Sequence, residues 1–473
     1  MRHPYSYRRA LASLVVGALA AWPAPLLASG FQLVEQNASG LGNAYAGQAA
    51  GVQDASAIFF NPARLARLSG KQVVVAVSPV GIATTFDDTA STRPQLGPVS
   101  IPVPLGNTGG DAGGWVPVPN AYFSWQVASQ WWLGLGVNAP FGLKTEWDSD
   151  WVGRFTAVSS EVHTININPT VAIKLSDAFS IGGGADYQRL KATLSQEVPY
   201  GGLAFGGAVA AAGPAAGAGI LAQLGGPAGL ALEGLSAVEG DTWSWGWNVG
   251  AALEIGDSGS LAATYRSAIK HDLDGNVTFA GAPSFATVGP LGGLGTALNA
   301  RFADGPVTAQ IELPETVSVA AAYEGETVEL LADWTWTGWS SIQTLTIERA
   351  GGPVLSQVPL NFEDTWRAGL GFNYKLQDAW TLRLGTAYDR TPVQDAHRTP
   401  RLPDQDRIWA AIGFQYRLGK AGALDLGYSH LFIDEGMSML PNQTAPTSPP
   451  TGNLIGHYHA KVDIVSVQYR HSF

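Results

Sequence analysis

The chain of 473 residues carries a formal net charge of −11, contains no cysteine, and has only 14% charged residues. The absence of cysteine excludes disulfides and thiolate chemistry, and the negative charge disfavours a nucleic-acid partner, which requires basic patches. Soluble proteins usually have about 25% charged residues, so this deficit indicates a surface that water does not wholly cover. Mean hydropathy is only +0.06. No apolar run of about 20 residues follows the N-terminal segment, so we expect no membrane-spanning helices.

The N-terminal segment has the three parts of a secretory signal. Basic residues begin it, an apolar stretch covers residues 11–27, and Ala28 or Ser29 offers a small residue for cleavage. A membrane anchor is the alternative, but the apolar stretch is short and ends in small residues. We therefore expect residues 1–28 to be a signal peptide.

Residues 29–70 contain many small residues and no long alternation between apolar and polar positions. Asn61 before Pro62 predicts the start of a helix, because Asn caps helices and Pro suits the first helical position. Such a segment ahead of a barrel is either a periplasmic extension or a plug. Its content of Gly, Ala and Phe favours a hatch inside the lumen, with Asn61, Pro62 and Ala63 as its gating residues.

From residue 71 onward, apolar and polar residues alternate with a period of two. Trp243, Trp245 and Trp247 share one face, for example, while Ser244 and Gly246 share the other. Successive side chains of a strand point to opposite faces, so this pattern predicts strands with one apolar face. Many of these segments run for 12 to 18 residues, whereas soluble strands usually have about 5–6. The length argues against a soluble sandwich or propeller and for strands that cross a membrane.

The fold class is therefore predicted as all-β: a transmembrane antiparallel β-barrel of about 14 strands over residues 71–473, with the hatch inside. Long connections at 198–240, 281–305 and 436–459 are expected to be extracellular loops. The last strand alternates up to the terminal Phe473, which resembles the signal read by the outer-membrane assembly machinery. The approximate strands are 71–86, 117–127, 131–145, 160–175, 179–197, 241–256, 259–280, 306–323, 327–349, 361–376, 379–394, 404–418, 423–435 and 460–473.

Several motifs, in the same order along the chain, carry a resemblance to a known family. They include Ser29-Gly30-Phe31-Gln32-Leu33, Asn61-Pro62-Ala63, Phe141-Gly142-Leu143-Lys144-Thr145-Glu146-Trp147 and Pro403-Asp404-Gln405-Asp406-Arg407-Ile408-Trp409. With these motifs the chain resembles the FadL-type long-chain fatty acid transport family of outer-membrane proteins. The resemblance implies a 14-stranded barrel, a hatch that blocks the lumen, and a kink in the third strand that opens sideways into the membrane.

The kink would fall at Ala139, Pro140, Phe141, Gly142 and Leu143. Pro140 lacks an amide donor, and a glycine in a strand often marks a bend or a bulge. The alternative is that Gly142 is an ordinary packing glycine in a glycine-rich barrel.

The function predicted from the resemblance is passive uptake of long-chain fatty acids or similar hydrophobic compounds, without an enzymatic step, a cofactor or a metal. Uptake of monoaromatic or other uncharged hydrocarbons is the alternative. Leu194 and Glu363 stand where fatty-acid members of the family carry basic pocket residues, which weakens the expected carboxylate site. The possible lumen cations that remain are Arg189, Lys191, Arg367 and Arg383.

A second expected ligand site is an outer groove that first collects ligand, formed by helices of the loop 198–240 together with residues 281–305. This loop has apolar residues on a Gly/Ala background, among them Phe205, Ile220, Leu221 and Leu224, and exposed apolar surface often marks a binding site. Alternatively, these apolar residues could pack one loop against another without binding a ligand. The expected surroundings are outer-membrane lipid and lipopolysaccharide, and the expected state is a monomer.

Two other classes of protein fit the sequence less well. A lipid hydrolase would need a serine paired with a histidine, but the chain has only eight histidines, mostly in loops or near its ends. The pair His457 and His459 lacks a nearby third metal ligand, so we interpret it as solvated. A general diffusion porin would need an open polar lumen, which a hatch at 29–70 would obstruct.

Overall fold

The wall of the molecule is one antiparallel sheet that closes on itself. The computed structural model describes residues 30–96, 99–442 and 450–473, so the signal peptide expected over 1–28 lies outside the described residues. The first strand, β1 (Lys71–Asp88), pairs with the last, β22 (Leu454–Ser472), through partners such as Val77 and Val467. The closed barrel has 14 strands when interrupted strands are counted once, which confirms the predicted fold class. Closure pairs the first strand with the last, so the sheet has no free edge strand for lipid to meet.

Eight strands are continuous and six are interrupted. The continuous strands are β1, β4 (Gly114–Ala128), β7 (Ser159–Lys174), β8 (Phe179–Val198), β9 (Gly234–Ile255), β18 (Trp380–Asp389), β19 (Arg407–Leu418) and β22. The interrupted strands are β5 (Trp131–Asn138) with β6 (Gly142–Glu146), β10 (Gly259–Arg266) with β11 (Ile269–Phe279), β12 (Gly305–Leu313) with β13 (Thr316–Glu324), β14 (Val328–Thr337) with β15 (Thr344–Arg349), β16 (Val354–Pro359) with β17 (Thr365–Gln377), and β20 (Gly422–Ile433) with β21 (Gly436–Leu440). A separate small hairpin joins β2 (Gln95–Leu96) to β3 (Val99–Ser100).

Two of the expected loops are shorter than predicted. Strand β9 already begins at Gly234, inside the expected loop 198–240, and β21 and β22 occupy both ends of the expected loop 436–459. The strands run on because their pairing continues: β9 stays paired with β8 up to the Gly234–Val198 pair.

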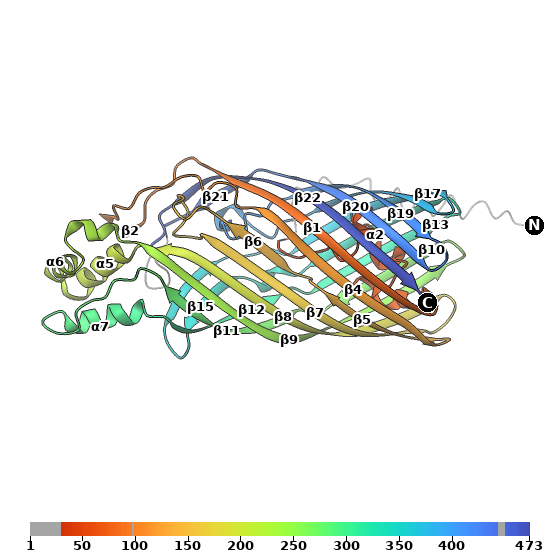
Figure 1. Cartoon of the computed structure of the whole chain (residues 1–473), viewed down its shortest axis with the longest axis horizontal. Coiled ribbons are helices and arrows are strands. Elements are labelled where there is room, and N and C mark those ends of the chain that lie inside the picture. The colour runs from red at the N-terminus through yellow and green to blue at the C-terminus, as the bar shows by residue number, and fades with distance from the viewer. Residues whose placement is uncertain (1–29, 97–98, 443–449) are drawn as a thin grey trace, which may run out of the picture.

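The two ends of the barrel differ (Figure 1). One end, here called the loop end, carries helices α5 (Tyr200–Ala212), α6 (Pro214–Gln223) and α7 (Gly292–Arg301), with the 3-10 turn η2 (Pro227–Ala231). The other end, the turn end, holds the C-terminus and short connections such as residues 256–258. Long loops of such barrels face the outside of the cell and short turns face the periplasm. No helix among the described residues is long and apolar enough to span a membrane.

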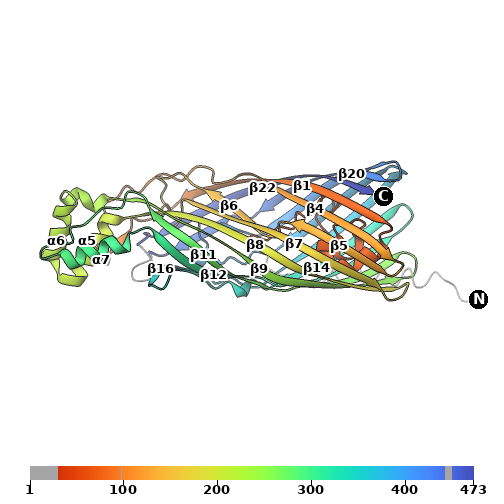
Figure 2. The same ribbon diagram turned by 60° about the horizontal axis from the view of Figure 1, so that its bottom comes forward.

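Residues 30–70 contact the inner wall on all sides. Their elements are α2 (Ala38–Leu41), α3 (Gln48–Gly51), α4 (Ala57–Phe60) and the 3-10 helix η1 (Pro62–Arg67). Helix α2 packs on β19, β20 and β22, α3 packs on β10, β13 and β14, and η1 packs on β7, β8 and β9. A segment that touches opposite parts of one closed wall lies within it, and Figures 1 and 2 show it near the turn end.

Candidate functional site

The polarity of the barrel wall reverses part-way along its strands, and β8 shows this clearly. Toward the turn end, Tyr187 is on the outer face, stacked between Trp243 and Trp245 with ring centroids 4.5 Å from each, while Gln188 is buried on the inner face. Toward the loop end, charged Arg189 is on the outer face and apolar Leu190 is buried inside. The lumen is therefore polar near the turn end and apolar near the loop end.

An apolar cavity occupies the lumen at the loop end, beneath the loop helices. It consists of two connected spaces of about 60 and 40 Å³ that share Leu194, Val238, Leu345 and Ile347. We call this space the outer cavity. Its upper part also borders Leu203 of α5, so the helices of the loop end cover it. Apart from the polar groups at its upper end, the cavity is lined mainly by apolar side chains.

Two arginines line the upper part of the outer cavity. The Arg401 guanidinium donates hydrogen bonds to Ser160 Oγ (3.1 Å) and Gln196 Oε1 (2.9 Å), both neutral acceptors. Arg301, at the end of α7, is the second. Within the described ranges, no carboxylate lies at ion-pair distance from either guanidinium. Arg401 is half-buried and Arg301 is exposed at the rim, so a ligand carboxylate would supply a counter-ion to both guanidinium groups.

Partial burial changes the proton affinity of Arg401. Desolvation disfavours the charged form of a base, and it lowers the pKa of Arg401 to about 10. Arg401 nevertheless remains a cation at neutral pH.

A continuous cluster of apolar side chains leads from the outer cavity to the third strand of the barrel. Leu273 belongs both to the cavity lining and to this cluster. At the other end of the cluster, Phe31 packs against Trp339 and Phe141, with ring centroids 5.0 and 5.8 Å away. The cluster consists of Phe31, Phe141, Leu190, Leu273, Leu313, Trp339, Ile342, Phe362, Val393 and Leu402.

The barrel wall has a gap beside Phe141. Strand β4 pairs with β5 as far as Ala121 and Val137, and the rest of β4 has no ladder partner on β6 in the described sheet. The third strand also bulges here. From the Asn138 pair with Asn166 to the Gly142 pair with His163, the third strand advances four residues and β7 only three. One extra residue in a strand bends it and disturbs the ladder.

Residues 31–36, here called the gap segment, fill this gap from inside. On one side, the Gly142 amide donates to the Phe31 carbonyl (3.0 Å). On the other side, the Asn120 side chain of β4 donates to the Glu35 carbonyl (2.9 Å). Glu35 itself is 5% exposed, and burial raises its carboxyl pKa to about 7. The expected lateral opening therefore coincides with a break in the wall that the gap segment covers.

The predicted hatch residues are fixed against the wall at the turn end. Asn61 caps η1 by accepting a hydrogen bond from the Ala63 amide (3.0 Å), and it donates to the carbonyls of Ala49 (2.9 Å) and Ala251 (3.1 Å). The wall approaches so closely that a Cβ at Gly250 would lie 2.0 Å from the Asn61 side chain. Asn61 thus binds two parts of the hatch to β9.

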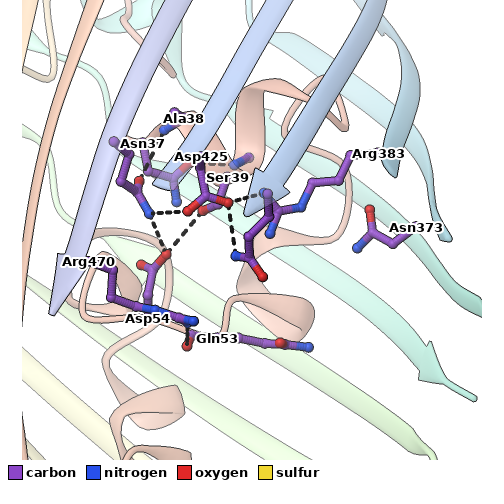
Figure 3. A network of polar contacts seen from close by, with 12 residues as sticks. Asn37, Ala38, Ser39, Gln53, Asp54, Asn373, Arg383, Asp425 and Arg470 are labelled. Carbon is purple, nitrogen blue, oxygen red and sulfur yellow. Dashed lines mark hydrogen bonds and ion pairs between the residues drawn. The ribbon is translucent and has the colours of Figure 1, made fainter. Parts of the chain in front are cut away.

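A polar network joins the rest of the hatch to the wall (Figure 3). Arg383 forms an ion pair with Asp425, and Gln468 donates to Asp54 of the hatch (2.8 Å). Ser39 also donates to Asp54 (3.1 Å). Because these partners come from β18, β20 and β22, the network fixes the hatch to several strands at once.

The predicted lumen cations are partly wrong. Arg189 and Lys191 lie on the outer face, where they pair with Asp241 (2.9 Å) and Glu239 (2.5 Å). They point outward because Leu190 between them points into the lumen.

Arg367 and Arg383 do lie in the lumen, but each is already paired, Arg367 with Asp333 at 3.4 Å and Arg383 with Asp425. Among the described residues that line the outer cavity, Arg401 and Arg301 are cations without a carboxylate partner, and sequence reasoning missed both. Leu194 and Glu363 stand at the two positions where the resemblance led us to expect basic pocket residues. Leu194 lines the outer cavity, and Glu363 pairs with Arg390 (3.3 Å).

The expected outer groove is not one continuous surface. Ile220 is fully buried with Phe285 and Leu298, where it joins α6 to α7, so it forms part of the loop core. Leu221 and Leu224 are half-buried and remain accessible. Phe205 is also half-buried and lies near Gly217 of the neighbouring helix α6.

In the part of the chain that the structure describes, the histidines considered for a metal lie beside carboxylates and not in a metal-binding cluster. No group of three or more His, Cys, Asp or Glu residues is arranged there to hold a metal ion. His457 pairs with Glu435 (3.2 Å) and His459 with Asp87 (3.3 Å).

Comparison with known proteins places the chain in a family. Residues 17–473 match the family described as "Outer membrane protein transport protein (OMPP1/FadL/TodX)". The long-chain fatty acid transport protein of Salmonella typhi is 29% identical over 408 residues, which cover 85% of this chain and 87% of that protein. A 47 kDa outer membrane protein of Pasteurella multocida is 28% identical, covering 94% of this chain and 96% of that one.

Solved structures agree. A Pseudomonas aeruginosa FadL homologue has a TM-score of 0.80 at 27% identity, covering 94% of this chain and all of that chain (100%). The Pseudomonas putida toluene transporter TodX shares the fold with a TM-score of 0.62 at 16% identity, covering 94% and 100%. The outer-membrane location expected from the sequence is confirmed, and the chain belongs to the OMPP1/FadL/TodX family of outer-membrane transport proteins.

Proposed function

We propose that this protein takes up long-chain fatty acids passively, by capture at the loop end, binding in the outer cavity and lateral exit through the third-strand gap. The observation that carries the proposal is the pair of arginines, Arg401 and Arg301, which lack carboxylate partners at the top of an apolar cavity. A fatty acid has the complementary shape: one carboxylate on an apolar chain. Half-buried Leu221 and Leu224 provide the first apolar contact.

The route below the cavity stays apolar. Each CH₂ group that leaves water is stabilised by about 0.8 kcal/mol, so a long chain moves most readily along surfaces that keep it dry. The cluster from Leu273 to Phe141 is such a surface, and it ends at the gap. Exit requires the gap segment to move, and we propose that the anchored hatch around Asn61, Pro62 and Ala63 guides this movement.

Uptake of an uncharged hydrocarbon is the weaker candidate. The toluene transporter shares only the fold with this chain at 16% identity. A hydrocarbon would also leave Arg401, which is half-buried, without a counter-ion. No covalent step is proposed for either ligand.

The test is to titrate the purified protein with hexadecanoic acid and with its methyl ester. We expect the acid to bind at least tenfold more tightly, because only the acid carries the charge that the arginines lack. Mass spectrometry of ligand that copurifies with the protein gives an independent answer. Equal affinity for acid and ester would contradict the proposal, and a copurified hydrocarbon would support the second candidate.

A further inference from the structure

Two prolines occupy alternate positions on the part of β4 that borders the wall gap. Strand β4 lies between β1 and the third strand (Figure 1), and it pairs with the third strand only as far as Ala121. Beyond Ala121, Pro117 and Pro119 are exposed on the outer face, with buried Val118 between them. Proline has no amide hydrogen, so it cannot donate to a ladder. The effect of the two prolines depends on which neighbouring strand their nitrogens face.

The strand register shows that both nitrogens face the gap. In an antiparallel ladder, the N–H and C=O of one residue point to the same neighbouring strand, and successive residues alternate between the two neighbours. The even-numbered Gln126 of β4 donates to the Gly70 carbonyl just before β1 (2.8 Å). Pro117 stands opposite Pro79 of β1, in a pair that cannot exchange hydrogen bonds. The even-numbered residues of β4 therefore bond to β1, and the odd-numbered ones, among them Pro117 and Pro119, face the third strand.

The gap segment is already bonded to the opposite side of the gap. Leu33 donates its amide to the Pro140 carbonyl (2.8 Å), and the Gly142 amide donates to the Phe31 carbonyl (3.0 Å). These two bonds make this part of the gap segment a short strand antiparallel to the third strand. They flank Gln32, so its own N–H and C=O point the other way, toward β4.

Side chains alone join β4 to the gap segment. Asn120 donates to the Glu35 carbonyl (2.9 Å), and the Tyr122 hydroxyl donates to the Gln36 carbonyl (3.2 Å). Among the described residues, no backbone hydrogen bond runs from β4 residues 114–120 to the gap segment. The gap segment is therefore a strand that is bonded along one edge, and its other edge faces β4.

The missing donors of β4 explain why this second edge stays free. The gap segment is antiparallel to the third strand and hence parallel to β4. Counting back along both chains from the Asn120 contact brings Gln32 level with Pro117. A parallel ladder here would use the N–H groups of residues 117 and 119, which proline lacks. An unpaired N–H that faced hydrocarbon would also be costly, so proline suits an edge that must open, as it suits edge strands that must not pair.

We propose that Pro117 and Pro119 keep the gap segment releasable. Because they deny it a second ladder, the gap segment can leave the gap without the breaking of backbone hydrogen bonds to β4. This inference rests on the proposed lateral exit, and it gives two residues of the wall a positioning role in that step. Both rings face outward, so replacing them leaves the lining of the lumen unchanged.

The test is the double variant Pro117→Ala with Pro119→Ala, made in the full chain. The restored N–H groups should bond to the gap segment, so its amide hydrogen exchange, followed by mass spectrometry, should slow roughly tenfold. Uptake of radiolabelled hexadecanoic acid by cells should fall by a similar factor. The affinity of the purified protein for hexadecanoic acid should not change, because the outer cavity is unaltered. Each single variant should show a smaller effect in the same direction.

Pro79→Ala is the matched control. Pro79 also lies in a strand of the wall, but it faces β22, where it interrupts the ladder between Val77 and Val80. This variant should match the wild type in exchange and in uptake. Barrel assembly of each variant is checked first by its heat-dependent mobility on gels.

The inference is overturned if the gap segment of the assembled double variant exchanges at the wild-type rate, or if Pro79→Ala slows it equally. Slower exchange with unchanged uptake would overturn it as well, because release of the gap segment would then not be needed for exit. If the wild type neither binds nor takes up hexadecanoic acid, the proposed function fails, and the exchange rates still decide whether the prolines keep the gap segment free.

Discussion

Replacing Arg401 by Met tests whether the outer cavity binds a carboxylate. The substitution keeps an apolar chain in place but removes one of the two cations at the top of the cavity. A hydrogen bond to a charged group contributes about 1.5–3 kcal/mol, and 1.4 kcal/mol corresponds to a tenfold change in affinity. Arg301 remains, so we expect the lower part of this range: a loss of about tenfold in affinity for hexadecanoic acid.

The assay is displacement of a fluorescent fatty acid, measured with hexadecanoic acid and with its methyl ester as competitors. The ester should be almost unaffected by the substitution. Since burial lowers the pKa of Arg401 to about 10, wild-type affinity for the acid should fall as pH rises through about 10. Arg401→Lys, which retains the charge, is the control. An equal loss for acid and ester would refute the reasoning, because it would mean that the cavity had collapsed.

Three further predictions concern the hatch and the gap. Gly142→Arg should block growth on a fatty acid even when the variant protein reaches its normal abundance in the outer membrane. The reason is that even a Cβ at this position would lie 2.9 Å from Leu33 of the gap segment. Normal growth would exclude exit at this site. Asn61→Ala should speed amide hydrogen exchange in residues 49–64 at least tenfold. The substitution removes a helix cap and leaves the carbonyls of Ala49 and Ala251 without their donor. Unchanged exchange would show that other contacts hold the hatch. Burial raises the pKa of Glu35 from 4.5 to about 7, so the closed gap segment binds the proton more tightly than the open one. Closure should then weaken as pH rises from about 4.5 to 7, and spin labels should report this in the wild type but not in Glu35→Gln.

The strands could be predicted because their successive side chains face the lumen and the outer surface in turn, and these two environments favour different residue types. All fourteen predicted segments contain a strand of the barrel. The Asn61-Pro62 signal also held locally, since Asn61 caps η1. Such signals are short-range: they depend on neighbours in the sequence and on the period of the chain.

The binding cations could not be found in this way. Alternation shows that Arg189 and Leu190 face opposite sides, but not which side is the lumen. Membrane barrels usually have a polar lumen and an apolar outer face. Near the loop end this arrangement is reversed, because the lumen there is apolar and the outer face carries charged side chains. Arg401 and Arg301 belong to connections that fold back over the lumen, and no local pattern gives the path of such a connection.

The reversal of polarity along β8 also fixes how deeply the barrel sits in the bilayer. If the wall moved inward, Arg189 would enter the hydrocarbon, at a cost of up to about 2–4 kcal/mol for a charge at the midplane. If it moved outward, the aromatic side chains around Tyr187 would leave the membrane and be exposed to water. The register of β7 with β8 places Thr164, which bonds to Phe141, directly beside Leu190. The wall gap therefore lies level with the outer boundary of the hydrocarbon, and a molecule leaving sideways there would arrive in the outer leaflet with its polar end already among the headgroups.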